Sequence, residues 1–593
     1  MRTRLRFVAA AGLLWLLASA PAVPAQEAKL AVEEHTLKNG MHFLFVERHQ
    51  TPTVSGGWAA HVGSANETYG QTGIAHLFEH MMFKGTTTVN TKDFAKERPI
   101  MEKLDAVRAE LAAEYEKVRA AKRLGEFEGE IYDPEKETPR IKELRAQLKK
   151  LQDEQSALVV KEEWDGIYEG QGSSSKNAFT TNDVTVYIVK IPANKLELWF
   201  WMESERLRDA VLREFYAERD VVREERRMRV ESDPTAAYDE QFEAMFWTAT
   251  PYHHPVIGWP ADVESISREQ GEAFFSTYYA PNNLTGVLVG DFDPKIAREL
   301  AEKYFGRLPR GQKVPPVIVT EEIEQLAERR MAAAADTNPK VFVRWRTVPA
   351  IHKDSGAFKV AAGLLQGRAG RLYKSLVEEQ GIATGEPGAS AGWPQRLGGY
   401  MELDAELAEG HGHAEIEAAL LAEIERLRTV AVGEQELQRV KNQTLADSYR
   451  RLEDSFYLMI QLAYFAGLGD WRLLETSTSR VLAVTAEDVL RVAAAYLTPE
   501  RKNVLWYSRK AGAPEDPELA GLDARGKGFV KQALAQLEAI ADATQLAKAV
   551  EELRSMGQQV PAEMKPAVDI AVRRGEERLK KLQAATSSEE AKQ

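Results

Sequence analysis

The chain of 593 residues contains no cysteine, so disulfide bonds, thiolate metal ligands and lipid attachment through cysteine are all excluded. It also lacks any long basic run. Acidic side chains outnumber Lys and Arg by 90 to 77, which gives a formal net charge of −13. Because nucleic-acid binding needs clustered cations to neutralise phosphates, no nucleic acid is expected as a partner. A chain without thiols is compatible with an oxidising compartment, since nothing in it can mispair.

Long apolar runs are also scarce, and the clearest one lies at the N-terminus, in "MRTRLRFVAAAGLLWLLASAPAVPA". Three arginines precede the apolar run and small residues ending at Ala25 follow it, which is the layout of a Sec signal peptide over residues 1–25. The run is too short to favour a membrane span, and an uncleaved anchor is the alternative. We therefore expect a bacterial protein that is periplasmic or secreted, with no stable membrane span after cleavage.

Two regions of similar organisation follow, at residues 30–310 and 325–510. In each, strands with alternating apolar residues are interspersed with amphipathic helices, and the Pro-containing stretch "RGQKVPPVIVTEEIEQ" predicts a linker between them. The order of strands and helices in the second region repeats that of the first, which indicates a duplication. The predicted fold class is α+β, with two related domains that each have an antiparallel sheet and helices packed on one face.

Two further segments are predicted to be helical. Between about residues 99 and 165, apolar side chains recur at helical spacing on both sides of "YDPEKETP", which predicts an antiparallel helical hairpin inserted into the first domain. This hairpin is either a surface arm or a docking arm for a partner. Residues 511–593 predict a helical tail, whose apolar positions indicate packing: Leu534, Leu537, Leu546, Val550 and Leu553.

The segment "GIAHLFEHMMFKGT", residues 73–86, carries the most informative chemistry. His76 and His80 are four residues apart, so a helix places both imidazoles on one face, with Glu79 close beside them. Two neutral imidazoles at this spacing can share a Zn²⁺ ion, and the carboxylate can accept a proton from a water molecule. A structural pair of histidines is the alternative. The other paired histidines are expected in loops or turns and not as ligands: His253, His254, His411 and His413.

A catalytic zinc site needs a third protein ligand and an open position for water. The best candidates lie in "ERDVVREE", where Glu218 and Glu225 are seven residues apart and so share a helix face. Glu224 points roughly 100° away from Glu225, and only one of this adjacent pair can face a metal together with Glu218. A solvated charged helix face is the alternative.

Taken together, these motifs resemble the pitrilysin/insulinase family of zinc metallopeptidases. Within that family the resemblance is to the half-length, processing-peptidase-like bacterial type. The inverted H-x-x-E-H motif marks the inverzincins. Other matching segments occur in the family's order between Leu30 and Arg509: "NAFTTNDVTVY", "ERDVVREERRM", "PYHHPVIGWPADV" and "YYAPNNLTGVLVGDFDP". The resemblance implies the LuxS/processing-peptidase-like metallohydrolase fold, one Zn²⁺ per chain, and hydrolysis of extended peptides or unfolded segments in a closed chamber.

The resemblance also implies a role for each matched residue. His76, His80 and Glu225 match the zinc ligands, Glu79 the general base and Glu218 an auxiliary acidic residue. The strand that follows the substrate backbone is matched by Asn177, Ala178 and Phe179. The gap between His80 and Glu225 is longer than is usual in the family, because the helical hairpin lies within it.

One departure from the family pattern concerns the second domain. Active members often carry an Arg and a Tyr seven residues apart, in a pattern like "LREKRGLAY", which polarise the scissile carbonyl or the oxyanion. The matching segment here is "LVEEQGIAT", with Val377 and Thr384 at those positions. We therefore expect the zinc-bearing subunit of a heterodimer, whose related partner supplies the Arg/Tyr pair. A homodimer, or oxyanion support from other residues, is the alternative.

Two other functions compete with peptide hydrolysis. The first is a non-catalytic peptide-binding or scaffold subunit with a vestigial zinc site, and the complete His/Glu set argues against it. The second is metal storage or zinc sensing, which the lack of multiple His/Cys tracts disfavours.

Overall fold

The computed structural model describes residues 30–510, 518–519, 521–538, 540, 543–558, 560–561 and 564–590. The predicted signal peptide lies outside these residues. The chain divides into two compact units, Met1–Arg509 and Lys510–Gln593, which are described separately below. Within the described residues, no helix is both long enough and apolar enough to cross a bilayer.

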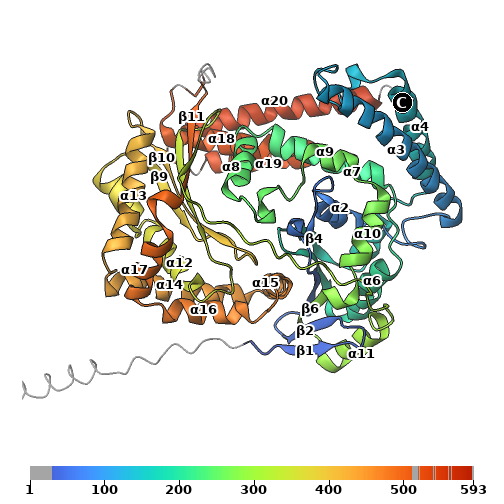
Figure 1. Cartoon of the computed structure of the whole chain (residues 1–593), viewed down its shortest axis with the longest axis horizontal. Coiled ribbons are helices and arrows are strands. Elements are labelled where there is room, and N and C mark those ends of the chain that lie inside the picture. Colours follow the sequence, from blue (N-terminus) through green and yellow to red (C-terminus); the bar gives the residue numbers. More distant parts are fainter. Residues whose placement is uncertain are drawn as a thin grey trace, which may run out of the picture. The chain divides into compact units, whose positions relative to one another are not determined.

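The larger unit contains two sheets (Figure 1). The strand order in the first is β1 (Glu33–Thr36), β2 (His42–Glu47), β6 (Leu284–Gly290), β3 (Thr53–Ala60), β5 (Thr185–Pro192) and β4 (Ser174–Thr180). The strand order in the second is β7 (Arg329–Ala335), β11 (Lys502–Arg509), β8 (Lys340–Thr347), β10 (Gly399–Leu407) and β9 (Ala383–Ser390).

The two sheets share one topology, which supports the predicted duplication. In each, the last strand of the half pairs in parallel with a strand near its beginning: β6 with β2, the second strand of the first half, and β11 with β7, the first strand of the second half. The remaining pairs among these strands are antiparallel, and β4 and β9 occupy the same edge position. The parallel pair is a departure from a wholly antiparallel sheet. It arises because the last strand returns only after the helices, through a long crossover connection.

Helices surround both sheets. Those of the first half are α2 (Ile74–Met81), α3 (Phe94–Arg123), α4 (Pro139–Ser156), α5 (Glu163–Glu169), α6 (Leu196–Arg208), α7 (Phe215–Arg226), α8 (Ala236–Phe246), α9 (Pro260–Ser265), α10 (Arg268–Tyr278) and α11 (Pro294–Tyr304). Those of the second half are α12 (Ser355–Leu365), α13 (His413–Thr429), α14 (Glu434–Glu453), α15 (Ser455–Leu468), α16 (Leu473–Ala483) and α17 (Ala486–Tyr496).

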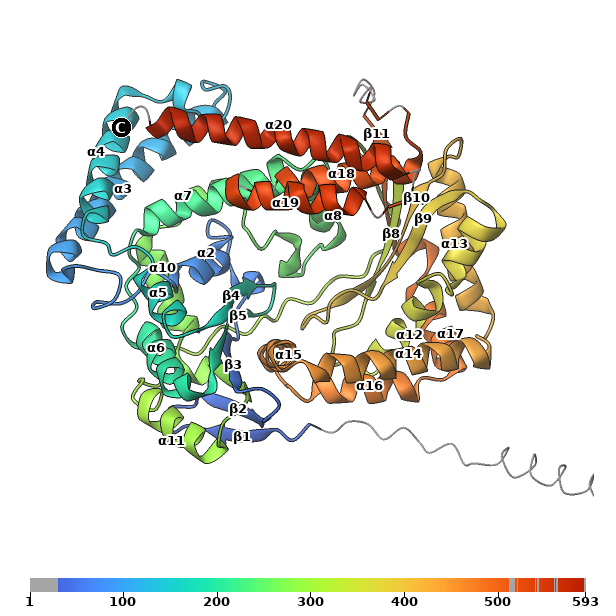
Figure 2. The same ribbon diagram turned by 180° about the vertical axis from the view of Figure 1, so that it is seen from behind.

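The first sheet is covered on both faces, not on one face alone. Helices of its own half pack on one face, and α15 from the second half packs on the other (Figure 2). Two adjacent glycines in β3 make this close packing feasible, since neighbouring strand residues point to opposite faces. A Cβ on Gly56 would lie 2.5 Å from Nε1 of Trp199, and a Cβ on Gly57 would lie 2.6 Å from Sδ of Met459. The sheet thus joins the two halves through one apolar core.

The segment predicted as a hairpin forms α3 and α4, which pack against each other around a small core of their own: Leu111, Tyr115, Val118, Ile141 and Leu144. The first helix begins at Phe94, earlier than the boundary predicted near Pro99. Its start is fixed by Asp93, whose side chain accepts a hydrogen bond from the Lys96 backbone N–H. Pro99 therefore lies inside the helix.

The C-terminal unit consists of α18 (Ala524–Glu538), α19 (Ala543–Gly557) and α20 (Lys565–Glu590). Its interior includes three of the apolar positions singled out from the sequence, which are fully buried: Leu537, Leu546 and Val550.

The contact between the first sheet and α15 yields a stability prediction. Leu462 is fully buried at this contact, so Leu462→Ala removes apolar contacts and leaves a cavity. We expect a loss of about 2–5 kcal/mol in the free energy of unfolding of the larger unit. The matched control is Val430→Ala, at a residue that is 60% exposed, with an expected effect below about 0.5 kcal/mol. Urea unfolding followed by tryptophan fluorescence measures both, and equal effects would contradict the packing described.

Candidate metal centre

Helix α2 presents an apolar face to the core and a polar face to a cavity. Ile74, Leu77 and Phe78 are buried in the core of the first half, while His76 and His80 emerge on the other side. The helix therefore packs against the core through one face and presents the two histidines to the cavity on the other.

Two carboxylates fix the loop that leads into α2. Glu67 accepts hydrogen bonds from the backbone N–H groups of Gly73 and Ala75, both at 2.8 Å. Asp262 accepts hydrogen bonds from the Gly70 N–H and from the Thr72 hydroxyl. Burial raises the pKa of Glu67 well above its ordinary value. These contacts satisfy donors at the start of the helix and set its position.

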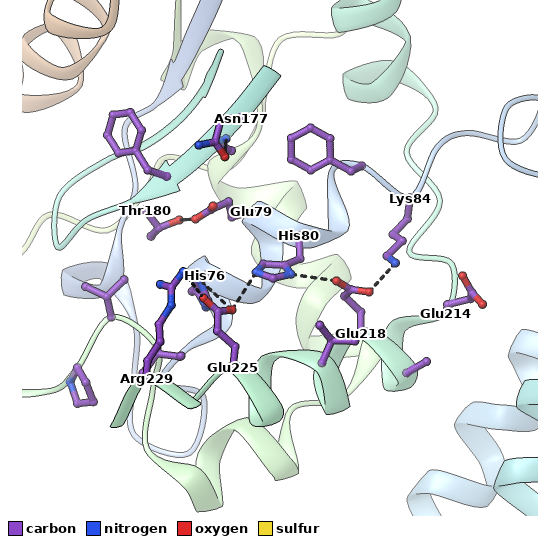
Figure 3. A pocket seen from close by; sticks show the side chains of 18 of the residues that line it. His76, Glu79, His80, Lys84, Asn177, Thr180, Glu214, Glu218, Glu225 and Arg229 are labelled. Atoms are coloured by element: carbon purple, nitrogen blue, oxygen red, sulfur yellow. Dashed lines mark hydrogen bonds and ion pairs between the residues drawn. The ribbon is translucent and has the colours of Figure 1, made fainter. Parts of the chain in front are cut away.

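The structure brings His76, His80 and Glu225 together (Figure 3). Oε2 of Glu225, on α7, lies 3.7 Å from Nε2 of His76 and 3.4 Å from Nε2 of His80. Glu224 lies on the solvent side of α7, half exposed, and pairs with Arg227. Within the described residues this is the single group of three or more His, Asp or Glu side chains close enough to hold a metal ion.

His80 lies between two carboxylates, as Figure 3 shows. Its Nδ1 is 2.9 Å from Oε1 of Glu218, and the other oxygen of Glu218 is 2.5 Å from Nζ of Lys84. Arg229 approaches the second oxygen of Glu225 at 2.9 Å. Each carboxylate therefore has one oxygen toward an imidazole and one toward a cation, which fixes the orientation of both.

The pKa values follow from burial and from these contacts. Burial lowers the pKa of His76 to about 4, so this imidazole is neutral at pH 7. Burial also acts to lower the pKa of His80, but its hydrogen bond with Glu218 and its ion pair with Glu225 outweigh that effect and raise the pKa to about 9. The pKa of both carboxylates is lowered, because His80 and the nearby cations outweigh the opposing effect of burial. Glu218 and Glu225 therefore favour a positive charge at the position between them.

The donor set fits a zinc ion. Among the described residues, Nδ1 of His76 and Oε2 of Glu225 are buried and have no hydrogen-bond partner. Tetrahedral zinc with bond lengths near 2.0–2.2 Å places its ligand atoms roughly 3.3–3.5 Å apart, close to the separations between Glu225 and the two imidazoles. A divalent cation at this point would give the orphaned carboxylate oxygen a partner.

Glu79 lies beside the triad and faces strand β4. Its carboxylate accepts a 2.7 Å hydrogen bond from the Thr180 hydroxyl, and burial raises its pKa. Asn177, Ala178 and Phe179 belong to β4, the edge strand of the sheet, and they line the same cavity of about 1270 Å³ as the histidines. The free strand edge and the candidate base are therefore neighbours.

A buried arginine connects the two helices that carry the site. Arg213 immediately precedes α7 and donates hydrogen bonds to the backbone carbonyls of Lys84, Thr86 and Val89, in the loop that follows α2. Its charge is balanced by Glu97 of α3, at 2.8 and 2.9 Å from Nε. Both side chains are fully buried. This guanidinium group thus joins the loop after α2 to the segment that leads into α7.

The positions that differ from the family pattern contribute nothing to this cavity. Val377 is partly buried against the core of the second half, and Thr384 pairs with Glu406 between β9 and β10. Within the described part of the chain, the residues that line the cavity all fall between His76 and Ile257. The second half therefore supplies no donor here.

Sequence reasoning missed several residues of the site: Lys84, Thr180, Arg213 and Arg229. Helical spacing could have indicated two of them, because Lys84 is four residues after His80 and Arg229 is four after Glu225. Strand alternation could have indicated Thr180, two residues after Ala178. The role of Arg213 has no local signal, since its partners lie far away in the sequence.

A sheet with an H-x-x-E-H helix packed on it, repeated in a second half without the motif, is the arrangement expected of an inverzincin-type metallohydrolase. Two family models match the chain. That for Insulinase (Peptidase family M16) matches residues 43–102, and that for the Peptidase M16 inactive domain matches residues 265–444. Both models are of peptidase family M16, the pitrilysin/insulinase family, which supports placing the chain in that family.

The chain is also similar to named relatives in sequence and to solved structures in fold. Zinc protease PqqE of Helicobacter pylori is 26% identical over 482 residues, which are 78% of this chain and 90% of that protein. The crystal structure of a protease from Helicobacter pylori has a TM-score of 0.65 at 23% identity and covers 81% of this chain and 100% of its own. The periplasmic protease PqqL from Escherichia coli has a TM-score of 0.57 at 17% identity, over 82% of this chain but 48% of PqqL.

The contact between Glu218 and His80 predicts a specific effect on metal affinity. Glu218→Gln removes the charge that holds Nδ1 of His80, so we expect the dissociation constant for zinc to rise by about 10- to 100-fold. Glu224→Gln, at a half-exposed residue of the same helix, is the matched control and should leave that constant unchanged. Competition with a chromogenic chelator measures both, and an equal effect of the two variants would contradict the geometry.

The buried Arg213 predicts a large effect on stability. Arg213→Met leaves Glu97 buried without its counter-charge, so we expect a loss of about 3–5 kcal/mol in the free energy of unfolding. Arg227→Met removes an exposed ion pair at the end of α7 and should leave the free energy of unfolding nearly unchanged. Urea unfolding of the two variants tests the difference, and comparable midpoints would show that Arg213 does not hold the two helices.

Proposed function

We propose that the chain is a zinc-dependent endopeptidase that hydrolyses extended peptides or unfolded protein segments. The observation that carries this proposal is the convergence of His76, His80 and Glu225, with Glu79 beside them, next to the free edge of β4. The matches to models of peptidase family M16, and relatives named as zinc proteases, support the same class of reaction.

In this proposal, the residues divide the work as their positions indicate. His76, His80 and Glu225 hold the metal, and Glu218 fixes the orientation of His80. A bound Zn²⁺ would supply a Lewis acid that polarises a peptide carbonyl and favours deprotonation of water. An extended substrate adds as a strand to the edge of β4, where backbone hydrogen bonds hold it beside Asn177–Phe179.

Glu79 is proposed as the general base and acid. Its carboxylate takes the proton of the attacking water, and the protonated carboxyl then delivers that proton to the leaving amine. Burial, which raises its pKa, brings the carboxyl closer to the range in which it can both accept and donate. Thr180 holds the carboxylate toward the strand on which the substrate lies.

The donor for the oxyanion is proposed to come from a second subunit. Val377 and Thr384 stand at the positions where the family often has Arg and Tyr, and the lining of the cavity comes from the first half alone. The match with this chain covers 48% of PqqL and 94% of a structure of the first half of PqqL. The rest of PqqL is therefore long enough to contain a second unit of similar size. A related partner with the Arg/Tyr pair would complete the site, and a homodimer is the alternative.

A peptide-binding or scaffold subunit is the second candidate function. The missing Arg/Tyr pair favours it, as does the match of the second half to the inactive-domain model. The complete metal-ligating set weighs against it. For either function we propose a periplasmic location, on the strength of the signal-peptide pattern and of PqqL, a structural neighbour described as periplasmic.

The central test of catalysis is the variant Glu79→Gln. The amide preserves the shape of the side chain and leaves the three ligands in place, but it cannot accept the proton of water. We expect zinc content to stay at one ion per chain while peptide hydrolysis falls by about 10²- to 10⁴-fold. Zinc is measured by mass spectrometry of the purified protein and hydrolysis with quenched fluorescent peptides, alone and with a related subunit that carries Arg and Tyr. Full activity in the variant would refute the proposal.

A further inference from the structure

A second cavity, of about 1060 Å³, adjoins the same edge strand from its other side. Asn177 and Phe179 of β4 line both cavities, whereas the histidines line the first one alone. The remaining wall of the second cavity comes largely from the second half. Its aromatic part consists of Trp393, Tyr400, Phe456, Tyr457, Tyr464 and Phe465.

Two cations that line this cavity have no counter-charge. Lys359 on α12 and Arg451 on α14 make no side-chain hydrogen bond or ion pair with any residue that the structure describes. The other charged groups of the wall are paired: Lys176 with Asp165, Asp183 with Arg396, and Glu243 with Arg344. The chain as a whole has a net charge of −13, so an apolar cavity with two unpaired cations is a local region of positive charge.

Among the described residues, no carboxylate forms an ion pair with Lys359. Its side chain is exposed to the cavity, yet protein surrounds it on the other sides. Burial, with Arg451 and Arg480 nearby, lowers its pKa to about 8. Arg480 donates hydrogen bonds to the backbone carbonyls of Ala350 and Ile351, and among the described residues no carboxylate forms an ion pair with any of these three cations. An incoming carboxylate would relieve this repulsion.

The duplication gives these helices a parallel in the first half. In each half a helix follows the strand that pairs antiparallel with the last strand of that half: α2 follows β3, and α12 follows β8. The second helix after the hairpin that contains the edge strand is α7 in the first half and α14 in the second. In the first half these two helices carry imidazoles and carboxylates, which suit a metal cation. In the second half they carry Lys359 and Arg451, which suit an anion. The same pair of elements thus presents opposite chemistry.

Strand geometry connects the two cavities to one peptide. Successive side chains of an extended strand point to opposite faces of a sheet. On β4, Ala178 and Thr180 face α2 and Glu79, whereas Asn177 and Phe179 face the second cavity. A peptide added to the edge of β4 would therefore direct alternate side chains toward the metal side and toward the two cations.

We propose that the second cavity is a substrate subsite that binds a carboxylate of the peptide, close to the scissile bond, through Lys359 and Arg451. The carboxylate belongs either to an acidic side chain or to a free C-terminus, and the aromatic wall contacts the apolar groups next to it. This inference rests on the proposed binding of peptides along β4 and gives the enzyme a preference for acidic substrates.

The test measures binding without hydrolysis. Four short labelled peptides differ only in having Glu or Gln at one position and a free or amidated C-terminus. Fluorescence anisotropy gives their dissociation constants for the zinc-loaded Glu79→Gln protein. We expect at least one carboxylate-bearing peptide to bind about tenfold more tightly than the Gln amide. A Glu preference that persists in the amides identifies a side-chain carboxylate, and a preference for the free terminus identifies the C-terminus.

Variants of the two cations complete the test. Lys359→Gln combined with Arg451→Gln should reduce the ratio of dissociation constants to about one, and Lys359→Arg should preserve it. The matched control is Lys374→Gln, at an exposed lysine of the second half that lines neither cavity, and it should also preserve the ratio. Equal binding of all four peptides to the protein with both cations intact would overturn the inference, as would an acid preference that survives the double variant.

This experiment separates the subsite from catalysis. If the protein binds acidic peptides preferentially but never hydrolyses any peptide with zinc and a partner present, the proposed enzyme function fails and the subsite stands. If zinc-dependent hydrolysis is found without any preference for carboxylates, the subsite fails and the enzyme function stands.

Discussion

The candidate site depends on a charged group in a place where charge is costly. Arg213 is fully buried, and its guanidinium is balanced by Glu97 of α3 and by three backbone carbonyls in the loop after α2. Such a group is tolerated only when its donors are paired, so the loop after α2, the helix α3 and the start of α7 must keep one relative geometry. That geometry is what brings the two histidines and Glu225 within a few ångströms. The hairpin formed by α3 and α4 thus supports the site, and it lies between the ligands in the sequence.

The two halves of the larger unit show how one topology acquires two chemistries. Five strands of the first sheet pair in the same way as the five strands of the second, yet α2 and α7 bear ligands for a cation, and their counterparts α12 and α14 bear cations. The first sheet is also held by α15 from the second half, so the two halves share a core. As a result, β4 is exposed along its edge while both of its faces are flanked by chemically distinct cavities.

Sequence patterns predicted the parts of this structure that depend on short-range spacing. The four-residue interval between His76 and His80, the seven-residue interval between Glu218 and Glu225, and the apolar periodicity of the hairpin each follow from helix geometry. The order of elements predicted the duplication, because both halves obey the same alternation. The parallel strand pairs, the packing of α15 on the first sheet and the role of Arg213 could not be predicted. Each depends on contacts between residues far apart in sequence, and no local period records them.

The structure shows where Val377 and Thr384 lie, the two positions at which the sequence departs from the family pattern. Val377 packs against a core and Thr384 belongs to an edge strand, so neither position is directed into the metal cavity. Whatever stabilises the oxyanion must therefore come from elsewhere, and a second subunit is the source that we propose.

Anomalous diffraction at the zinc absorption edge tests whether His76, His80 and Glu225 hold one zinc ion. In crystals of the protein grown with zinc, we predict one strong anomalous peak about 2.0–2.2 Å from Nε2 of His76, Nε2 of His80 and a carboxylate oxygen of Glu225. A peak elsewhere with this triad empty, or no peak at all, would contradict it.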